Sequence, residues 1–324
     1  MKTVQLGSTG IEVSELCFGT MSFGGDADEA MSGKMFNRCR EAGINFFDCA
    51  NVYAGGKSEM ILGKRIADCR EQLVITSKVA TPVGEGPNSG GLSRRHIHQQ
   101  IDLTLQRLGT DRLDVYFCHH FDPKTPLEVT FRAFEDLIRA GKILHVGLSN
   151  WSAWQIALAI GTCRQLGLST PAVLQPMYSL AKRTCEIEIL PLAADQNLGV
   201  IPYSPLGGGL LTGKYLGGRD KVKGRIATNQ MYAKRYGDQK YDRVAADFVD
   251  YAEKSDHNPV TLAVAWVKAH PAVTAPIIGA RNLDQLEDSL AAADLDLSET
   301  QRQEITDLTP PVPLATDRTE EKDR

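Results

Sequence analysis

The fold is decided by a stretch that runs from Leu73 to His119 and reads LVITSKVATPVGEGPNSGGLSRRHIHQQIDLTLQRLGTDRLDVYFCH. Short apolar runs at 73–78 and 114–118 have the character of buried parallel strands. Residues 94–108, between them, are amphipathic and helix-like, and Ser93 is a plausible N-terminal cap for that helix. The stretch therefore predicts a strand, a helical crossover and a second strand.

The same alternation continues in both directions along the chain. A run of eight strands, each followed by a helical crossover, predicts an α/β protein of the (β/α)8 TIM-barrel type rather than an open sheet. The other predicted strands are 15–20, 44–48, 143–148, 172–175, 198–203 and 273–278, and the other clear helical stretches are 28–42, 127–140, 152–166, 185–196 and 259–269.

Three segments depart from the repeat. Residues 4–13 read as a small N-terminal hairpin around a turn-rich centre, and residues 207–240 form a long, Gly-rich and cationic loop after the seventh strand. This loop is either a solvated excursion or a functional segment. We expect residues 1–310 to form one barrel domain, which is within the usual size of this fold, and residues 311–324 to form a polar, flexible tail.

Composition argues against several classes of partner. The formal net charge is -4, and charges of both signs are mixed along the chain. We expect no nucleic-acid partner, because binding to a phosphate backbone requires a clustered cationic face. Residues 1–7 lack the apolar core of a signal peptide, and nowhere do about 18 apolar residues follow one another. We therefore expect a cytoplasmic protein without a membrane partner.

The cysteines indicate no metal site and no disulfide framework. Seven of them are scattered along the chain, and no two form a Cys-x-x-Cys pair. We expect most of them to be buried free thiols; they are Cys17, Cys39, Cys49, Cys69, Cys118, Cys163 and Cys185.

Four residues with acid-base capacity lie where predicted strands end, which is where barrels of this type place their active sites. Asp48 closes the second strand, and Tyr53 follows in its loop. Lys78 closes the third strand, and His119 follows the fourth. Each residue alone has an ordinary structural explanation, as a loop cap, a packing residue or a surface charge. Together they predict an active site.

The chemistry that this set favours is general acid catalysis. An ammonium is costly to bury without an acidic partner, and Asp48 is the candidate partner of Lys78. A phenol with a pKa of about 10 is a poor acid, but a neighbouring ammonium stabilises the phenolate, so Lys78 should make Tyr53 more acidic. His119, as a neutral donor, would orient or polarise a substrate carbonyl. Redox work would require a cofactor, because none of these groups supplies a hydride.

Several short motifs occur in a fixed order along nearly the whole chain. They are LCFGTM at 16–21, NFFDCANVY at 45–53, ITSK at 75–78, DVYFCH at 114–119, GLSN at 147–150, PYSPL at 202–206 and GARN at 279–282. In these motifs the chain resembles the aldo-keto reductases, a family of (β/α)8 barrels closed by an N-terminal hairpin that reduce carbonyl groups with NADPH. The resemblance places the catalytic tetrad on Asp48, Tyr53, Lys78 and His119. It selects His119 over the adjacent His120, and a metal site at this pair is not expected.

The resemblance also implies a cofactor site. Ser149, Asn150 and Gln175 would hold the nicotinamide carboxamide, and Tyr203 would stack on its ring. Arg281 would meet the adenosine 2'-phosphate, so NADP(H) is favoured and NAD(H) is left open. A Rossmann Gly-x-Gly-x-x-Gly motif is absent from the sequence. The full implied set is Gly19, Thr20, Met21, Ser149, Asn150, Gln175, Tyr203, Ser204, Leu206, Gly208, Gly279, Arg281, Gln285 and Ser289.

Two positions depart from the family pattern. Ser289 stands where relatives carry the Asn of a Gln-x-x-Glu-Asn motif, which puts the adenine contact and the preference between NADPH and NADH in doubt. Met21 stands where many relatives place a Trp beside the nicotinamide, so we expect a less aromatic pocket on that side.

The substrate is not readable from the sequence, because the loops that form the pocket vary freely on this fold. A small carbonyl compound is expected, with sugar aldehydes and keto sugars among the candidates, and the basic residues of 207–240 could bind either the cofactor pyrophosphate or a phosphorylated sugar aldehyde. Two alternatives are a cofactor-binding regulatory subunit with slow turnover and an aldolase-like Schiff base on Lys78. Oligomeric state is also left open.

Overall fold

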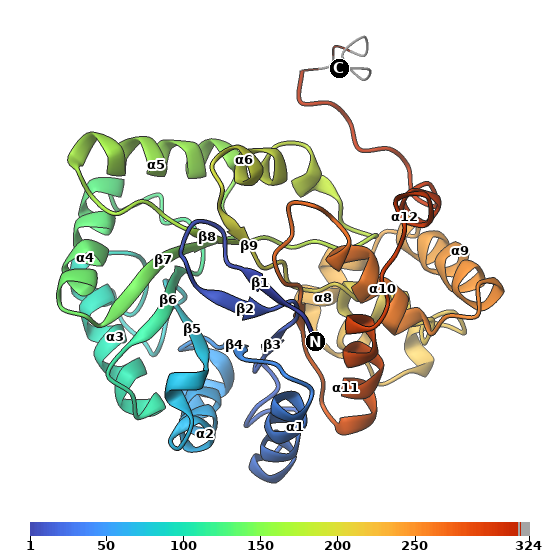
Figure 1. Cartoon of the computed structure of the whole chain (residues 1–324), viewed down its shortest axis with the longest axis horizontal. Coiled ribbons are helices and arrows are strands. Elements are labelled where there is room, and N and C mark those ends of the chain that lie inside the picture. Colours follow the sequence, from blue (N-terminus) through green and yellow to red (C-terminus); the bar gives the residue numbers. More distant parts are fainter. Residues whose placement is uncertain (317, 319–324) are drawn as a thin grey trace.

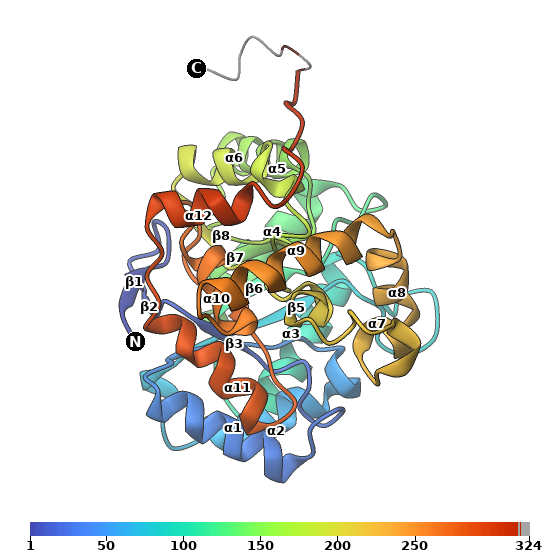
Figure 2. The same ribbon diagram turned by 90° about the vertical axis from the view of Figure 1, so that its right-hand side faces the viewer.

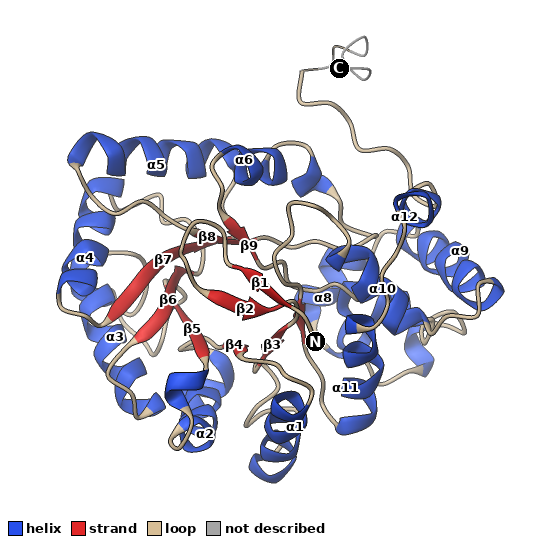
Figure 3. Ribbon diagram, in the orientation of Figure 1, coloured by secondary structure: helices blue, strands red, loops and turns tan. Residues whose placement is uncertain are grey.

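The computed structural model of the chain describes residues 1–316 and residue 318. A ring of parallel strands is surrounded by helices, which confirms the predicted (β/α)8 architecture (Figure 1, Figure 3). The strands of the ring are β3 (Cys17–Gly19), β4 (Phe46–Asp48), β5 (Val74–Val79), β6 (Leu113–Cys118), β7 (Ile143–Ser149), β8 (Val173–Gln175), β9 (Gly199–Val200) and β10 (Ile277–Ile278).

The sheet closes on itself. Strands β3 to β9 are neighbours in sequence order, and β10 pairs with β3. Between β9 and β10, the Thr274 N–H donates to the Val200 carbonyl at 2.8 Å. The Ile277 N–H likewise donates to the Pro202 carbonyl at 2.8 Å. Because all the strands run parallel around a closed ring, their carboxyl ends meet at one end of the barrel.

Local capping signals set the ends of the outer helices. The Ser93 side chain accepts a hydrogen bond from the His96 N–H, and Gly109 ends the same helix at a φ of 62°. Ser152 and Gln155 form a capping box at the start of another helix. The helices are α1 (Glu29–Glu41), α2 (Lys57–Ile66), α3 (Arg94–Leu108), α4 (Leu127–Arg139), α5 (Ala153–Leu166), α6 (Ile189–Asp195), α7 (Arg225–Thr228), α8 (Gln230–Tyr236), α9 (Lys240–Lys254), α10 (Pro259–Lys268), α11 (Leu283–Leu290) and α12 (Glu299–Thr306).

The predicted hairpin is formed by β1 (Thr3–Gln5) and β2 (Glu12–Ser14), and it covers the amino end of the barrel. Leu6 and Val13 are fully buried and belong to the same core cluster as Phe46 and Phe117 on the strands. The segment that contains α7 and α8 lies at the opposite end (Figure 2). One end of the barrel is therefore plugged, which leaves the carboxyl ends of the strands for a site.

A close backbone contact under the hairpin allows its packing against the barrel to be tested. Gly7 has a φ of 54°, and a Cβ placed on it would lie 2.3 Å from the Gly199 nitrogen. We expect Gly7→Ala to lower the free energy of unfolding by about 2 to 4 kcal/mol, because overpacking adds to backbone strain. Gly10 is the control, since its φ is 76° but a Cβ there would meet nothing within 4 Å. Urea denaturation measures both variants, and equal losses would contradict a tight contact at Gly7.

The last two strands of the ring are shorter than predicted. The runs 198–203 and 273–278 contain only β9 (Gly199–Val200) and β10 (Ile277–Ile278) as strands. Pro202 and Pro276 lie in these runs, and proline has no N–H to donate to a ladder. The helix predicted at 185–196 is also divided, into the 3-10 turn η3 (Thr184–Glu186) and α6. Pro191 offers no N–H to the Ile187 carbonyl, so a continuous helix cannot form there.

Residues 207–240 form the expected long connection without a strand, but helical turns occupy much of it. These are η4 (Gly207–Thr212), η5 (Arg219–Lys221), α7 and α8. Tyr215, Tyr232 and Tyr236 are buried together in a small core of this segment's own. The segment is therefore a packed cap on the barrel rather than a solvated excursion.

All seven cysteines are free, and all but Cys69 are buried. No helix within the described residues is both long and apolar enough to cross a bilayer. Within the same residues, no three His, Cys, Asp or Glu side chains gather as metal ligands would. Of the predicted tail, residues 317 and 319–324 lie outside the described part of the chain.

Candidate active site

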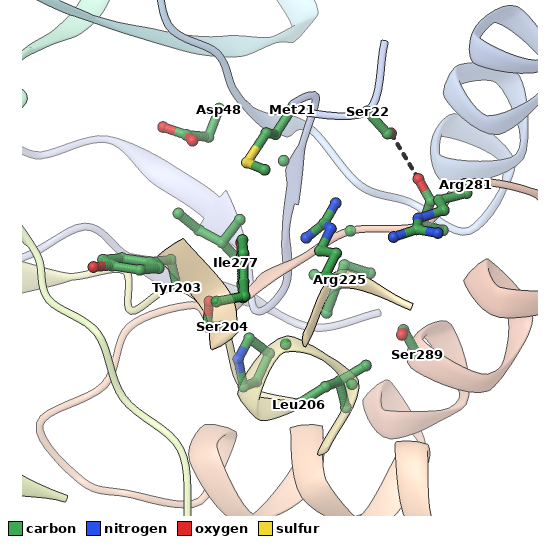
Figure 4. A pocket seen from close by; sticks show the side chains of 18 of the residues that line it. Met21, Ser22, Asp48, Tyr203, Ser204, Leu206, Arg225, Ile277, Arg281 and Ser289 are labelled. Atoms are coloured by element: carbon green, nitrogen blue, oxygen red, sulfur yellow. Dashed lines mark hydrogen bonds between the residues drawn. The ribbon is translucent and has the colours of Figure 1, made fainter. Parts of the chain in front are cut away.

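A cavity of about 1150 Å³ opens at the carboxyl end of the barrel. Its walls come from the loops that follow most strands of the ring and from the 207–240 segment (Figure 4). Ligand pockets in proteins usually measure about 300 to 1,000 Å³, so this cavity has room for a dinucleotide-sized molecule together with a small second ligand.

Lys78 and Asp48 form a buried ion pair at the floor of this cavity. The Lys78 Nζ donates to the Asp48 Oδ2 at 2.6 Å and to the Cys49 carbonyl at 2.6 Å. The two side chains are 0% and 3% exposed. Burial by itself lowers the pKa of Lys78, but the charges of Asp48 and Tyr53 and the hydrogen bonds to both together outweigh it and hold that pKa above its ordinary value. The ammonium is therefore charged and fixed in place.

The carboxylate of Asp48 is held from two further strands. Its Oδ1 accepts hydrogen bonds from the Thr76 hydroxyl at 2.7 Å and from the Gln175 side-chain amide at 2.9 Å. Both Thr76 and Gln175 are buried. Each oxygen of this buried carboxylate therefore has a hydrogen-bond partner, which offsets the water that it loses on burial.

Tyr53 lies beside this ion pair, in the 3-10 turn η1 (Tyr53–Gly56). Its hydroxyl oxygen accepts a hydrogen bond from the Lys78 Nζ at 3.3 Å. Burial raises the pKa of Tyr53 to about 12, although the Lys78 charge acts in the opposite direction. The expectation of a more acidic phenol is thus corrected, because lost hydration outweighs the neighbouring ammonium. Tyr53 is protonated throughout the neutral pH range.

The ring of His119 meets that of Tyr53 edge to face, with centroids 6.2 Å apart. The His119 Nδ1 lies 3.4 Å from the Thr81 hydroxyl. Burial, aided by the Lys78 charge, lowers the pKa of His119 to about 3. The imidazole is therefore neutral, as the sequence predicted. His120 also lines the cavity, with its Nδ1 3.1 Å from the Phe121 carbonyl.

Hydrogen bonds tie the ends of β7 and β9 to the loop of His119. The Tyr203 hydroxyl donates to the Asn150 Oδ1 at 2.7 Å, and the Asn150 Nδ2 donates to the His119 carbonyl at 2.9 Å. Asn150 has a left-handed backbone, with a φ of 59°, which costs energy in a residue other than glycine. Such strain is often found where a side chain must be aimed at a ligand.

Nearly all the sequence-predicted site residues line this one cavity. Lys78 lies below its floor, and Thr20 lies behind its wall, where the Thr20 hydroxyl bonds with the Asp48 carbonyl and with Ser58. The predicted residues that line the cavity are Asp48, Tyr53, His119, Gly19, Met21, Ser149, Asn150, Gln175, Tyr203, Ser204, Leu206, Gly208, Gly279, Arg281, Gln285 and Ser289.

Comparison with known protein families identifies the relatives of this chain. The model of the aldo/keto reductase family matches residues 15–310, which is nearly the whole chain. The chain belongs to the aldo/keto reductase family. This match confirms the resemblance seen in the sequence motifs.

Relatives of the reductase carry different names. An uncharacterized oxidoreductase, YrpG of Bacillus subtilis (strain 168), is 38% identical over 96% of each chain. A probable voltage-gated potassium channel subunit beta of Arabidopsis thaliana is 37% identical, over 91% of this chain and 92% of its own. The norsolorinic acid reductase of Aspergillus flavus is 31% identical, over 94% of this chain and 79% of its own. The chain is thus an oxidoreductase of a family that works with nicotinamide cofactors.

The charges on the cavity wall fit such a cofactor. Arg281 lies on the wall with its Nε 3.1 Å from the Asp26 carboxylate. Lys214 and Arg225 also line the cavity, and among the carboxylates whose side chains the structure describes, which leaves out Asp220, none is within ion-pair distance of either. Burial, together with the charges of Arg281 and Arg225, lowers the pKa of Lys214. An anion such as a dinucleotide phosphate, bound between these cations, would offset their mutual repulsion.

Some residues on the wall of the reductase were not found from the sequence. Asn258 caps α10 and donates from its Nδ2 to the Asp288 Oδ1 at 3.0 Å, close to Ser289. Ser22 donates to the Ala280 carbonyl at 2.6 Å (Figure 4). Asn258 directly precedes the helical stretch predicted at 259–269, where Asn and Pro favour a helix start, but no sequence signal tells a capping residue at a pocket from one at the surface.

Proposed function

We propose that this chain reduces an aldehyde or ketone with NADPH, and that Tyr53 gives its hydroxyl proton to the carbonyl oxygen. The observation that carries the proposal is the placement of Lys78 between Asp48 and Tyr53, with the phenol facing the cavity. When bound, the cofactor supplies a hydride to the carbonyl carbon, so hydride and proton together convert the carbonyl to an alcohol.

Each member of the tetrad then has a separate task. Lys78 stabilises the phenolate that Tyr53 becomes when its proton leaves, and Asp48 keeps Lys78 charged and oriented. His119 is neutral and lies next to Tyr53, so an N–H of its ring can donate to the same carbonyl oxygen and aim it at the phenol. The Lys78 ammonium stabilises the negative charge that develops on the Tyr53 oxygen as its proton leaves. Catalysis requires such an interaction to be stronger in the transition state than before the reaction.

The nicotinamide end of the cofactor site is assigned to Ser149, Asn150, Gln175 and Tyr203. All four residues line the cavity, where Asn150 donates to the His119 carbonyl and Gln175 donates to the Asp48 carboxylate. An amide on the nicotinamide needs both donors and acceptors, and Asn150 and Gln175 offer both. The ring of Tyr203 offers a flat apolar surface for stacking.

A carbonyl panel tests the proposal directly. We expect oxidation of NADPH that depends on the added carbonyl for some member of a panel of simple aldehydes, sugar aldehydes and keto sugars. Sugar carbonyls are included because Thr81, His119 and His120 give the wall near Tyr53 a polar character. No carbonyl-dependent oxidation of NADPH or NADH across the panel would contradict the proposed reaction.

Arg281 is expected to select NADPH over NADH. An arginine that binds a phosphate through charge-assisted hydrogen bonds contributes about 1.5 to 3 kcal/mol. Arg281→Met should therefore raise the Kd for NADPH about 10- to 100-fold and leave the Kd for NADH within about twofold, as measured by fluorescence titration. Arg38→Met is the matched control, because Arg38 pairs with Glu287 on an exposed helix face. If Arg281→Met raised the Kd for NADPH and the Kd for NADH by the same factor, Arg281 would not be the residue that binds the 2'-phosphate.

The rate of carbonyl reduction is expected to be independent of pH between about pH 6 and pH 9. The reason is that the pKa of His119 is lowered to about 3 and that of Tyr53 is raised to about 12, so neither group changes its charge in this range. Alcohol oxidation needs the phenolate of Tyr53, and its rate should rise with pH over the same range. Profiles of kcat in both directions test this, and a change in the reduction rate near pH 6.5 would point to an ionising His119.

A cytoplasmic location is part of the proposal. Its support is the set of free cysteines, six of which are buried, since a chain with this many unpaired thiols suits a reducing compartment.

A second candidate function is a cofactor-binding regulatory subunit. It is favoured by the relatives named as potassium channel beta subunits, at 37% and 36% identity. Co-purification of the tagged chain with a membrane protein, together with negligible turnover across the panel, would support this function. The complete set of Asp48, Tyr53, Lys78 and His119 around one cavity favours the enzyme.

A further inference from the structure

The cations that line the cavity fall into two groups. Lys214, Arg225 and Arg281 form one group, since the charges of both arginines act on Lys214. Figure 4 shows the side chains of Arg225 and Arg281 on the same side of the pocket, toward Ser289. This group suits the phosphates of the cofactor, because dinucleotide phosphates carry several negative charges close together.

Arg235 is not among the charges that act on Lys214. It is half-buried on α8 and lines the cavity, with its guanidinium 5.5 Å from the centre of the Tyr232 ring, which the Arg225 guanidinium also approaches, at 5.7 Å. Its positive charge also acts on the Tyr203 phenol, where it opposes the rise in pKa that burial causes. The hydroxyl of Tyr203 bonds to Asn150, and Asn150 bonds to the loop of His119. The charge of Arg235 therefore reaches the end of the cavity where the reaction is proposed to occur.

Among the side chains that the structure describes, no carboxylate neutralises Arg235. Within residues 1–219, 221–316 and 318, none comes within ion-pair distance of its guanidinium, and the nearest of these acids in the sequence have other partners. Asp238 pairs with Lys240 and Asp242 pairs with Arg219. The neighbouring Lys234, in contrast, is exposed and outside the cavity wall. A half-buried guanidinium without a carboxylate is an available site for an anion.

We propose that Arg235 binds an anionic group of the substrate, such as a carboxylate, and so directs the reductase toward carbonyl compounds that carry a negative charge. This inference rests on the proposed carbonyl reduction and adds the substrate class. The planar guanidinium can form two parallel hydrogen bonds with a carboxylate, which fixes orientation as well as charge. A substrate held in this way presents its carbonyl to Tyr53 and His119 in one orientation.

The test compares two aldehydes of nearly equal shape, 4-carboxybenzaldehyde and 4-nitrobenzaldehyde. Both carry a planar electron-withdrawing group, but only the carboxylate is charged. We expect Arg235→Gln to lower kcat/KM for the carboxylate about 10- to 100-fold, which is the size typical of a hydrogen bond to a charged group. The value for the nitro compound should change less than about threefold, and the Kd for NADPH should stay the same. Lys234→Gln, one residue away on the same helix, is the control and should change none of these values.

Other outcomes overturn the inference in distinct ways. Equal losses for both aldehydes, or a weaker Kd for NADPH in Arg235→Gln, would assign Arg235 to the cofactor or to the fold. Failure of the unaltered chain to reduce either aldehyde would count against the proposed function instead. In that case calorimetry with 4-carboxybenzyl alcohol and 4-nitrobenzyl alcohol on the NADP-loaded chain still decides about Arg235. The proposed anion site would be contradicted if 4-carboxybenzyl alcohol bound equally well to the unaltered chain and to Arg235→Gln. It would also be contradicted if the unaltered chain bound this compound no more tightly than 4-nitrobenzyl alcohol.

Discussion

Replacing Tyr53 with phenylalanine is expected to lower kcat for carbonyl reduction about 10²- to 10⁴-fold, the range that a positioned general acid contributes. The hydroxyl that is lost lies 3.3 Å from the Lys78 Nζ, whereas the ring that packs against His119 is kept. Cofactor binding should therefore survive, with the Kd for NADPH changed less than about twofold. Single-turnover kinetics and fluorescence titration of NADPH measure the two quantities separately.

The matched control is Tyr251→Phe, because the Tyr251 hydroxyl bonds to Glu304 at an exposed position away from the cavity. This variant loses a phenol group as well, and its kcat should equal that of the unaltered chain. Turnover retained in Tyr53→Phe would mean that another group gives the proton. The first candidate would then be His119, and a double variant with His119→Asn would test it. A loss of NADPH binding in Tyr53→Phe would mean that the hydroxyl supports the cofactor instead.

The fold could be predicted because its signals are local. Buried parallel strands appear as short apolar runs, and caps such as Ser93 appear beside the helices that they start. The extent of β9 and β10 depends instead on which backbone groups find partners, and Pro202 and Pro276 remove donors that an apolar run does not reveal. The cap formed by 207–240 was also hidden. Tyr232 and Tyr236 have the i, i+4 spacing of one helix face, but Tyr215 lies outside that helix, so only the folded chain brings the three together.

The candidate site could be predicted from the sequence where its residues lie at the ends of strands. Asp48 and Lys78 end neighbouring strands of a parallel sheet, so their contact follows from the topology. The pKa of Tyr53 does not follow in this way, because it depends on how much water the surrounding loops exclude. For a related reason, Asn258 was missed as a site residue, and Arg235 was expected only as one of the basic residues of 207–240. Their approach to the cavity is set by the path of long connections rather than by the strands.

Replacing Glu59 with alanine is expected to lower the free energy of unfolding by about 3 to 5 kcal/mol. Glu59 is fully buried on α2, where its Oε2 accepts from the Arg107 guanidinium at 2.9 Å. Its Oε1 accepts from the Ser77 hydroxyl at 2.6 Å and from the Thr104 hydroxyl at 2.9 Å. Alanine would leave Arg107 without its partner and two buried hydroxyls without an acceptor, and each of these losses is costly. Chemical denaturation with urea measures the change.

Glu29→Ala is the control for this buried pair. Glu29 bonds to Lys64 at 2.7 Å, but the side chains of Lys64 and Glu29 are 57% and 48% exposed, so its loss should cost less than about 1 kcal/mol. Similar losses in both variants would show that burial adds nothing to the Glu59 pair. Ser77 precedes Lys78 on β5, so this same carboxylate anchors the strand that carries the ammonium. Glu59→Gln can still accept a hydrogen bond from Ser77, so it should retain more of the kcat than Glu59→Ala does. The reason is that the contact between residue 59 and Ser77 supports both the stability of the fold and the position of Lys78.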